Sequence, residues 1–327
     1  MKVYKKYLFK FLLLFSFVLI VVFSINYLVD PYGNNNLFVE KQYKPIVNER
    51  GYKYSNIFYK QQYKLYDSYI LGSSRVMHIV PIDTSTYNFG VHVANNAEKL
   101  FLLQELIKHR KNIKNIYLGI DEFNFNISMN QHFIDKTKFQ DNNFNNYLSF
   151  SMLKFSLKSI KNKIMQHPIS YFQNNGVLIY YDKEYKIKHH QYDFSTKKFQ
   201  EEAKGYIKSL NNYILDEKSF KILMKIQKLC KKHKIHLYPF YTPRHDTLRI
   251  ALEHDSDLYT IDMQIKQRLV SIFGKLYDFT IEDPLNKQNI NFYDIVHYRN
   301  KIGNAIMTKF HSNNSYGKLL IKDSDAI

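Results

Sequence analysis

The sequence predicts an α/β protein, a three-layer α/β/α sandwich with a mostly parallel sheet, preceded by an N-terminal membrane helix. Short apolar runs of strand length alternate with amphipathic helical stretches, the pattern of parallel strands joined by helices. The third of these runs is almost continuously apolar, as a strand buried on both faces requires. A long apolar stretch near the N-terminus predicts the membrane helix.

The membrane helix is expected at Phe11–Val29, which carries no charge. A membrane span needs about 20 such residues. Lysines at positions 2, 5, 6 and 10 precede the stretch, so the positive-inside rule keeps the N-terminus in the cytoplasm. A cleaved signal peptide is the alternative, but no small-x-small cleavage site follows. We expect a single-pass anchor over 1–30 in the cytoplasmic membrane, with the C-terminal domain extracytoplasmic (periplasmic).

The rest of the chain divides into a juxtamembrane connection (31–62), an α/β domain (63–315) and a polar tail (316–327), loose from Ser312 onward. An Asn-, Phe-, Tyr- and Lys-rich insertion at 122–215 interrupts the domain and is interpreted as a substrate-facing cap. The expected strands are Asp67–Gly72, Thr86–Val91, Asn115–Ile120, Ile235–Tyr241 and Leu276–Phe279. The expected helices start at a cap on Asn95 or Asn96 and cover about 151–165, 198–214, Lys218–His233, 247–273 and Ile302–Phe310.

One serine stands where an α/β sheet places its sites. Gly72-Ser73-Ser74 follows the first strand, and sites gather at the carboxyl ends of parallel strands. A serine hydroxyl needs a neighbouring base, usually a histidine held by a carboxylate. Asp294 and His297 lie three residues apart, which on a helical turn puts both on one face. The sequence therefore predicts a Ser–His–Asp arrangement.

The order of these parts resembles the SGNH/GDSL hydrolase superfamily, whose fold is flavodoxin-like. It looks closest to membrane-anchored SGNH-like proteins of bacterial envelopes, several of which work beside membrane-bound O-acyltransferases. The resemblance covers about 66–125 and 217–311. It implies that Ser74 is the nucleophile, His297 its base and Asp294 the acid that orients the base.

The resemblance also implies an oxyanion hole made by the N–H of Ser74, the N–H of Gly90 in "YNFGVHVANN", and an asparagine side chain in a third block. A later glycine of the second block falls near Val93. In the third block, "YLGIDEFNF", Asp121 stands where the asparagine belongs, and a carboxylate repels an oxyanion. Three alternatives follow: Asn124 or Asn126 substitutes as the donor, Asp121 is protonated or turned away, or the site is weak. A fourth is that Asp121 only holds the loop.

Four further residues lie near the expected site and are candidates for functional or structural roles. Arg75 binds an anionic substrate group, pairs with Asp121, or forms a salt bridge at the strand–helix junction. His78 is a rival base, although we expect it to point away from Ser74. His245 is a candidate for the cleft lining, and Asp278 is expected to make structural hydrogen bonds.

No cofactor or metal is expected. His189 and His190 are adjacent and would face opposite ways in a strand, and no His-Glu-x-x-His or paired-cysteine pattern accompanies them. Neither a P-loop nor a dinucleotide fingerprint is present. The net charge is +18, but the lysines are scattered and no nucleic-acid motif occurs, so we expect no nucleic-acid partner.

The leading hypothesis is a membrane-anchored serine acyl esterase or O-acyltransferase that acts on a cell-envelope glycan, with an acetyl ester as the expected substrate. Its partners would be an envelope polysaccharide or acyl donor and a membrane-bound O-acyltransferase. The alternative is a catalytically weak or inactive SGNH-like scaffold that binds glycan or partners such an acyltransferase.

Overall fold

The computed structural model describes residues 2–33, 37–110, 112–128, 134–139, 147–312 and 314–322. They form two compact units. The segment expected as one insertion, 122–215, is divided between the units. The N-terminal unit comprises Met1–Lys60, Asp135–Phe172 and Ile179–Lys188, and the α/β unit comprises Gln61–Ile134, Gln173–Leu178 and His189–Ile327.

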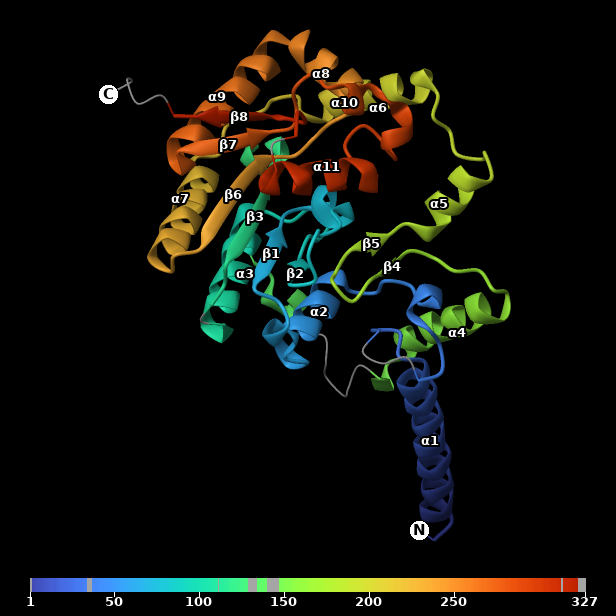
Figure 1. The fold of residues 1–327 in the computed structure, drawn as a ribbon. Helices are drawn as coiled ribbons and strands as arrows, with labels where there is room; N and C mark the ends of the chain where they lie inside the picture. The colour runs from blue at the N-terminus through green and yellow to red at the C-terminus, as the bar shows by residue number, and fades with distance from the viewer. Residues whose placement is uncertain are drawn as a thin grey trace. The chain divides into compact units, whose positions relative to one another are not determined.

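The N-terminal unit begins with the long helix α1 (Lys2–Val29), drawn in dark blue in Figure 1. Its stretch Tyr4–Val29 is long and apolar enough to cross a membrane, and only 6% of its most apolar window is buried. The structure thus supports a single N-terminal span by length and composition. The unit also holds α2 (Glu49–Tyr54), α4 (Phe150–Ile164), β4 (Tyr171–Phe172) and α5 (Tyr181–Lys188).

The α/β unit is organised by a six-stranded sheet in the order β2-β1-β3-β6-β7-β8. All neighbours are parallel except β7 and β8, which confirms the predicted α/β class and mostly parallel sheet. The parallel strands are thus in the doubly wound order 2-1-3-4-5, with a switch point between β1 and β3. The strands are β1 (Ser68–Leu71), β2 (Thr86–Asn88), β3 (Asn115–Ile120), β6 (His236–Tyr241), β7 (Lys275–Asp278) and β8 (Lys318–Ile321); β5 (Leu178–Ile179) lies outside this sheet.

The helices of the α/β unit follow the apolar periodicity of the sequence, with one division that it did not reveal. The stretch 247–273 was expected as one helical region but forms α8 and α9, because the Asp255 side chain accepts from Leu258 N–H and caps a new helix. Of the two expected caps for α3, Asn95 is the one used. The helices are α3 (Asn96–His109), α6 (Thr196–Ser209), α7 (Glu217–Lys232), α8 (Asp246–Glu253), α9 (Ser256–Phe273), α10 (Pro284–Lys287) and α11 (Asn300–His311).

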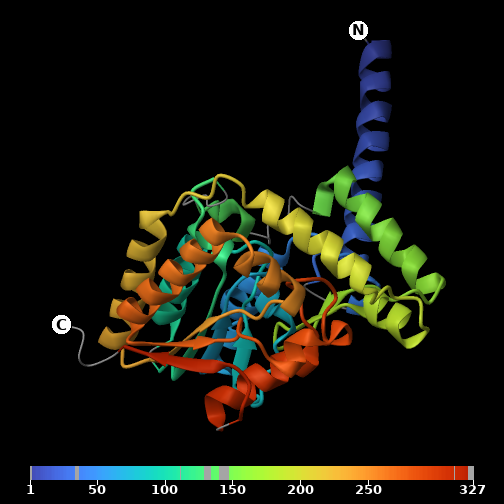
Figure 2. The ribbon, with the colours of Figure 1, turned by 90° about the horizontal axis from the view of Figure 1, so that it is seen from above.

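The helices pack on the sheet through aromatic and aliphatic side chains. Phe310 of α11 stacks on Tyr117 of β3 at 5.3 Å and contacts Phe240 of β6 at 5.5 Å between ring centroids. Helices α3 and α7 pack against each other. In Figure 2 these helices surround the sheet. The core of the unit therefore lies between the sheet and its helices.

The expectation of a loose tail beyond Ser312 is wrong for the strand β8, which pairs antiparallel with β7. Tyr316 is 3% exposed, and its ring stacks on Phe279 at 5.1 Å. The buried tyrosine holds the chain beside β7, whose free edge supplies the hydrogen bonds. Composition alone hides such a strand, because its partner is distant in the sequence.

Three glycines make room for one valine at the carboxyl end of β1. A Cβ atom on Gly72, Gly90 or Gly119 would lie within 2.4–2.7 Å of a Val76 methyl carbon. Val76 belongs to the short 3₁₀ turn η4 (Ser74–His78). The glycines therefore let this turn, which carries Ser74, dock directly on the sheet.

We predict that Gly119→Ala destabilises the protein by about 1–3 kcal/mol, the usual cost of overpacking a core. Its new Cβ would approach Val76 Cγ1 to 2.4 Å. The matched control is Gly205→Ala on α6, where nothing lies within 4 Å of the new Cβ. That change should be neutral or stabilising by up to about 1 kcal/mol. Urea unfolding checks both, and equal effects would contradict the packing argument.

Candidate functional site

Ser74 opens the turn η4 directly after β1. The Ser73 side chain accepts a hydrogen bond from Arg75 N–H at 3.2 Å and caps the turn. Ser74 itself is 7% exposed, and its backbone N–H has no hydrogen-bond partner among the described residues. A capped turn with an unused N–H at its start is a geometry that suits an oxyanion donor.

Asp294 and His297 lie in a loop before α11, not on the helical turn that their spacing suggested. Asp294 Oδ1 accepts from the N–H groups of Val296 and His297, at 3.0 and 2.8 Å. A bridge between Phe292 and Tyr298 closes the loop. An aspartate that bonds to the following backbone favours such a turn over a helix.

The loop brings His297 to Ser74. Ser74 Oγ lies 2.9 Å from His297 Nε2, and His297 Nδ1 lies 2.8 and 2.9 Å from the two oxygens of Asp294. A carboxylate accepts only, so Nδ1 donates to Asp294; in the neutral imidazole Nε2 then accepts from the serine hydroxyl. This is the geometry in which His297 can take the serine proton.

The carboxyl of Asp294 is held in its charged form. Burial favours the neutral acid, but the hydrogen bond and charge of His297, with the two backbone N–H groups, outweigh it and hold the pKa of Asp294 well below its ordinary value. Asp294 and His297 keep side-chain exposures of 26% and 21%. Asp294 is therefore ionised, and both side chains are accessible from solvent.

The second expected oxyanion donor is occupied. Gly90 N–H donates to Asn88 Oδ1 at 2.9 Å. The Asn88 amide nitrogen donates in turn to the carbonyls of Val76 and Ile79, at 2.7 and 3.0 Å. Asn88 thus ties the second block to the turn η4, and Gly90 can serve an oxyanion only if this bond is released.

Asp121 is fully buried at the end of β3. Its Oδ1 accepts from Thr242 Oγ1 at 2.6 Å, and Oδ2 has no hydrogen-bond partner among the described residues. Arg75 Nε lies 3.7 Å from Oδ1. The carboxylate therefore bonds to the neighbouring strand end, and it offers no donor for an oxyanion.

Arg75 is engaged by Glu122 more closely than by Asp121. Two guanidinium nitrogens donate to the Glu122 oxygens at 2.8 and 2.7 Å, and Nη2 also bonds to the Tyr206 hydroxyl at 2.7 Å. Arg75 is 2% exposed. Burial raises the pKa of Glu122, but the charge and hydrogen bonds of Arg75 outweigh it and lower the pKa to about 2. The Arg75 guanidinium is thus bonded to partners within the protein.

Asn124 is held by a buried lysine. Its Oδ1 accepts from Lys99 Nζ at 2.7 Å, and its amide nitrogen donates to the Ala94 carbonyl at 3.2 Å. Lys99 is 1% exposed, and this burial lowers the pKa of its ammonium to about 8. The amide of Asn124 is therefore part of the packing between α3 and the turn after β3.

Helix α6 contacts both loops that carry the candidate site, which the sequence reasoning missed. Lys198 donates to the Tyr293 carbonyl at 3.1 Å, and Glu202 accepts from Ile295 N–H at 3.2 Å, on either side of Asp294. Tyr206 bonds to the Arg75–Glu122 pair. The spacing of positions 198, 202 and 206 was a usable signal, because it places three polar side chains on one helical face.

The remaining candidates make local contacts. His78 Nδ1 lies 3.0 Å from the Leu178 carbonyl, and His245 caps α8. Asp278 accepts from Thr280 and pairs with Lys266 at 3.1 Å. Within the described residues no group of three or more His, Cys, Asp or Glu side chains could hold a metal ion. His189 and His190 are therefore not part of such a group.

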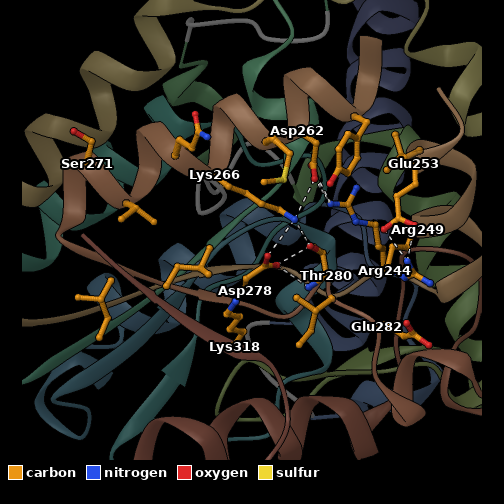
Figure 3. A pocket seen from close by; sticks show the side chains of 18 of the residues that line it. Arg244, Arg249, Glu253, Asp262, Lys266, Ser271, Asp278, Thr280, Glu282 and Lys318 are labelled. Atoms are coloured by element: carbon orange, nitrogen blue, oxygen red, sulfur yellow. Dashed lines mark hydrogen bonds and ion pairs between the residues drawn. The ribbon is translucent and has the colours of Figure 1, made fainter. Parts of the chain in front are cut away.

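A cavity of about 880 Å³ lies among α8, α9, β7 and β8, and no residue of the Ser74 site lines it (Figure 3). Several of its charged side chains pair with one another. Lys266 lies 3.2 Å from Asp262 and 3.1 Å from Asp278, and Arg244 donates to both oxygens of Asp262 at 2.9 Å. The Ser74 site therefore remains the candidate active site.

No protein-family model matches this chain, and no curated protein matches it.

We predict that Glu122→Gln destabilises the protein by about 3 kcal/mol at pH 7, because it leaves the Arg75 charge buried without its main counter-ion. The pKa of Glu122 in the folded protein lies below the ordinary 4.5. Its contribution to the free energy of unfolding is therefore present above pH 4.5 and is lost as the pH falls toward about 2. Urea unfolding at several pH values measures this. Glu217→Gln, which breaks the exposed pair with Arg268, is the control and should cost far less.

We also predict that Val93→Gly stabilises the protein by about 1 kcal/mol, because a β-branched residue is strained in the left-handed region. Val93 has φ of +51° and is 52% exposed, so little packing is lost. The control is Ile127→Gly, equally exposed at 53% but without a positive φ, which should destabilise. Thermal unfolding distinguishes the two variants. A lower Tm for both of them would refute the strain argument.

Proposed function

We propose that this chain is a membrane-anchored serine acyl esterase or O-acyltransferase with a three-layer SGNH-like fold. It acts on a cell-envelope glycan, on the extracytoplasmic side of the cytoplasmic membrane. The single observation that carries the proposal is the hydrogen-bond chain Ser74–His297–Asp294 at the carboxyl end of β1. The glycan, the acetyl group, the orientation and an acyltransferase partner come from the resemblance stated above.

The reaction begins when His297 Nε2 takes the proton of Ser74 Oγ. The oxygen attacks the ester carbonyl, and the Ser74 N–H donates to the resulting oxyanion. The carbon–oxygen bond to the alcohol breaks as His297 returns its proton to the leaving oxygen, which leaves an acyl-serine. Water then completes hydrolysis, or a sugar hydroxyl completes transfer, with His297 again as the base. Asp294 orients the imidazole and balances its charge throughout.

A second candidate function is a non-catalytic scaffold that binds glycan or partners a membrane-bound O-acyltransferase. Two observations favour it: Gly90 N–H is bonded to Asn88, and Asp121 occupies the place of an oxyanion donor. Loss of one such donor costs about 10²–10³ in rate. Under this reading the folded full-length protein binds glycan equally well with or without the Ser74 hydroxyl and turns over no ester.

We predict that Ser74→Ala lowers kcat for acetyl-ester hydrolysis on the order of 10⁶-fold, as loss of a triad nucleophile does. The assay uses the full-length protein in lipid nanodiscs. Asp294→Asn should lower kcat on the order of 10⁴-fold, because it favours the wrong imidazole tautomer. The control is Ser271→Ala, an exposed serine of the distant cavity, which should leave activity unchanged. Undiminished hydrolysis by Ser74→Ala would rule out Ser74 as the nucleophile.

A further inference from the structure

Helix α4 buries small polar side chains and exposes large apolar ones. Its serines at 156 and 159 are fully buried, and Asn162 is 8% exposed. On the opposite face Phe150, Leu157 and Ile164 are 58%, 53% and 76% exposed. A helix on a water-facing surface buries its apolar stripe and exposes its polar one. Water is therefore an unfavourable surrounding for this exposed face.

The exposed apolar residues form one stripe. Positions 150, 157 and 164 are seven residues apart, so they follow one another along the same side of the helix. Lys154, Lys158 and Lys161 are exposed along one edge of this stripe, and none of them pairs with an acidic group of the described chain. A stripe of large apolar side chains beside free lysines is the pattern of helices that lie in the interface of an anionic membrane.

The N-terminal unit attaches α4 to the end of the candidate membrane span. Asn26 of α1 donates to the carbonyls of Tyr147 and Ser149 at 2.8 and 3.0 Å and accepts from Ser156 Oγ at 2.8 Å. Tyr147 Oη donates to Asp30, the first charged residue after the span, at 3.0 Å. Ser156 on the buried face of α4 thus attaches the helix to α1, and Asn162 on the same face donates to the Tyr43 carbonyl at 3.1 Å.

The attachment lies at the level where a span leaves the hydrocarbon. A run of about 20 residues crosses the apolar core, so Phe11–Val29 places Asn26 within its last turn. The Tyr147 ring meets Tyr27 at 5.8 Å and Tyr32 at 5.9 Å, an aromatic group of the kind found at membrane interfaces. In Figure 1 and Figure 2, α4 runs obliquely away from this end of α1. The N-terminal end of α4 therefore lies beside the end of the candidate span, through the bonds of Ser149 and Ser156 to Asn26.

We propose that α4 docks on the surface of the lipid bilayer, with Phe150, Leu157 and Ile164 in its interfacial region and the three lysines against anionic headgroups. This inference rests on the membrane span of the proposed function and not on its ester chemistry. The occupant is lipid because α4 is bonded to the end of the candidate span, and anionic lipid because the three lysines have no counter-ions in the described chain.

The test places an environment-sensitive dye at single positions of the full-length protein in nanodiscs. The one native cysteine, Cys230, stays unlabelled, since burial raises the pKa of its thiol to about 12. The labelled variants are Leu157→Cys on α4, Ser16→Cys in the middle of α1, and Lys197→Cys on α6, whose native side chain is 83% exposed. We expect blue-shifted emission and quenching by brominated lipid at positions 16 and 157, and neither at 197.

Each other result overturns the proposal at an identifiable step. A dye in water at position 157 but in lipid at position 16 overturns α4 docking and leaves the span intact. Dyes in water at both positions overturn the span itself. A blue shift at 157 without quenching by brominated lipid means that protein covers the stripe, either a second copy or another partner.

The lysines are tested by Lys154→Glu, Lys158→Glu and Lys161→Glu combined, with the dye at position 157. At about 1 kcal/mol per lysine, docking on anionic nanodiscs should weaken on the order of 100-fold, and less in zwitterionic ones. The matched control reverses the same charge on α7, through Lys225→Glu, Lys228→Glu and Lys232→Glu, all exposed in the native protein. Equal weakening by both triple variants would show that net charge, not α4, governs the docking.

Discussion

The close approach of Val76 to Gly72, Gly90 and Gly119 is the constraint on which the site depends. It packs the five-residue turn η4 directly on the sheet. The directions of three consecutive side chains of that turn are then fixed. Ser74 faces His297, Arg75 reaches Glu122, and Val76 fills the glycine-lined space. A shift of this valine would move Ser74 and the buried Arg75–Glu122 pair together, because Ser74, Arg75 and Val76 are consecutive in the turn.

A second dependence joins segments far apart in the chain. Helix α6 contributes Tyr206 to the Arg75–Glu122 pair and Glu202 to the backbone beside Asp294. The two halves of the candidate site are therefore positioned by one helix as well as by the sheet. Such positioning matters because displacement of a reacting group by about 1 Å can cost 10²-fold in rate.

Much of the fold was predictable because its strands and helices follow from the spacing of apolar residues within short segments. The five parallel strands and most helices follow apolar periodicity, and the sequence order of Ser74, Asp294 and His297 led to one hydrogen-bonded group. What escaped prediction depends on distant partners. Strand β8 forms only on the free edge of β7. The hydrogen bond from Gly90 N–H to Asn88 depends on how the turn η4 packs on the sheet. The loop shape around Asp294 depends on side-chain bonding that spacing alone does not distinguish from a helix.

The order of segments along the chain has a consequence for how the protein is made. Strands β3 and β6 are neighbours at the centre of the sheet, with Asn115 opposite His236, yet the residues between them include α4 and α5 of the other unit. During synthesis the first half of the sheet must wait with an unpaired edge until β6 has emerged. Because closing so long a loop precedes the central pairing, the pairing of β3 with β6 is expected to be slow relative to the formation of the local helices.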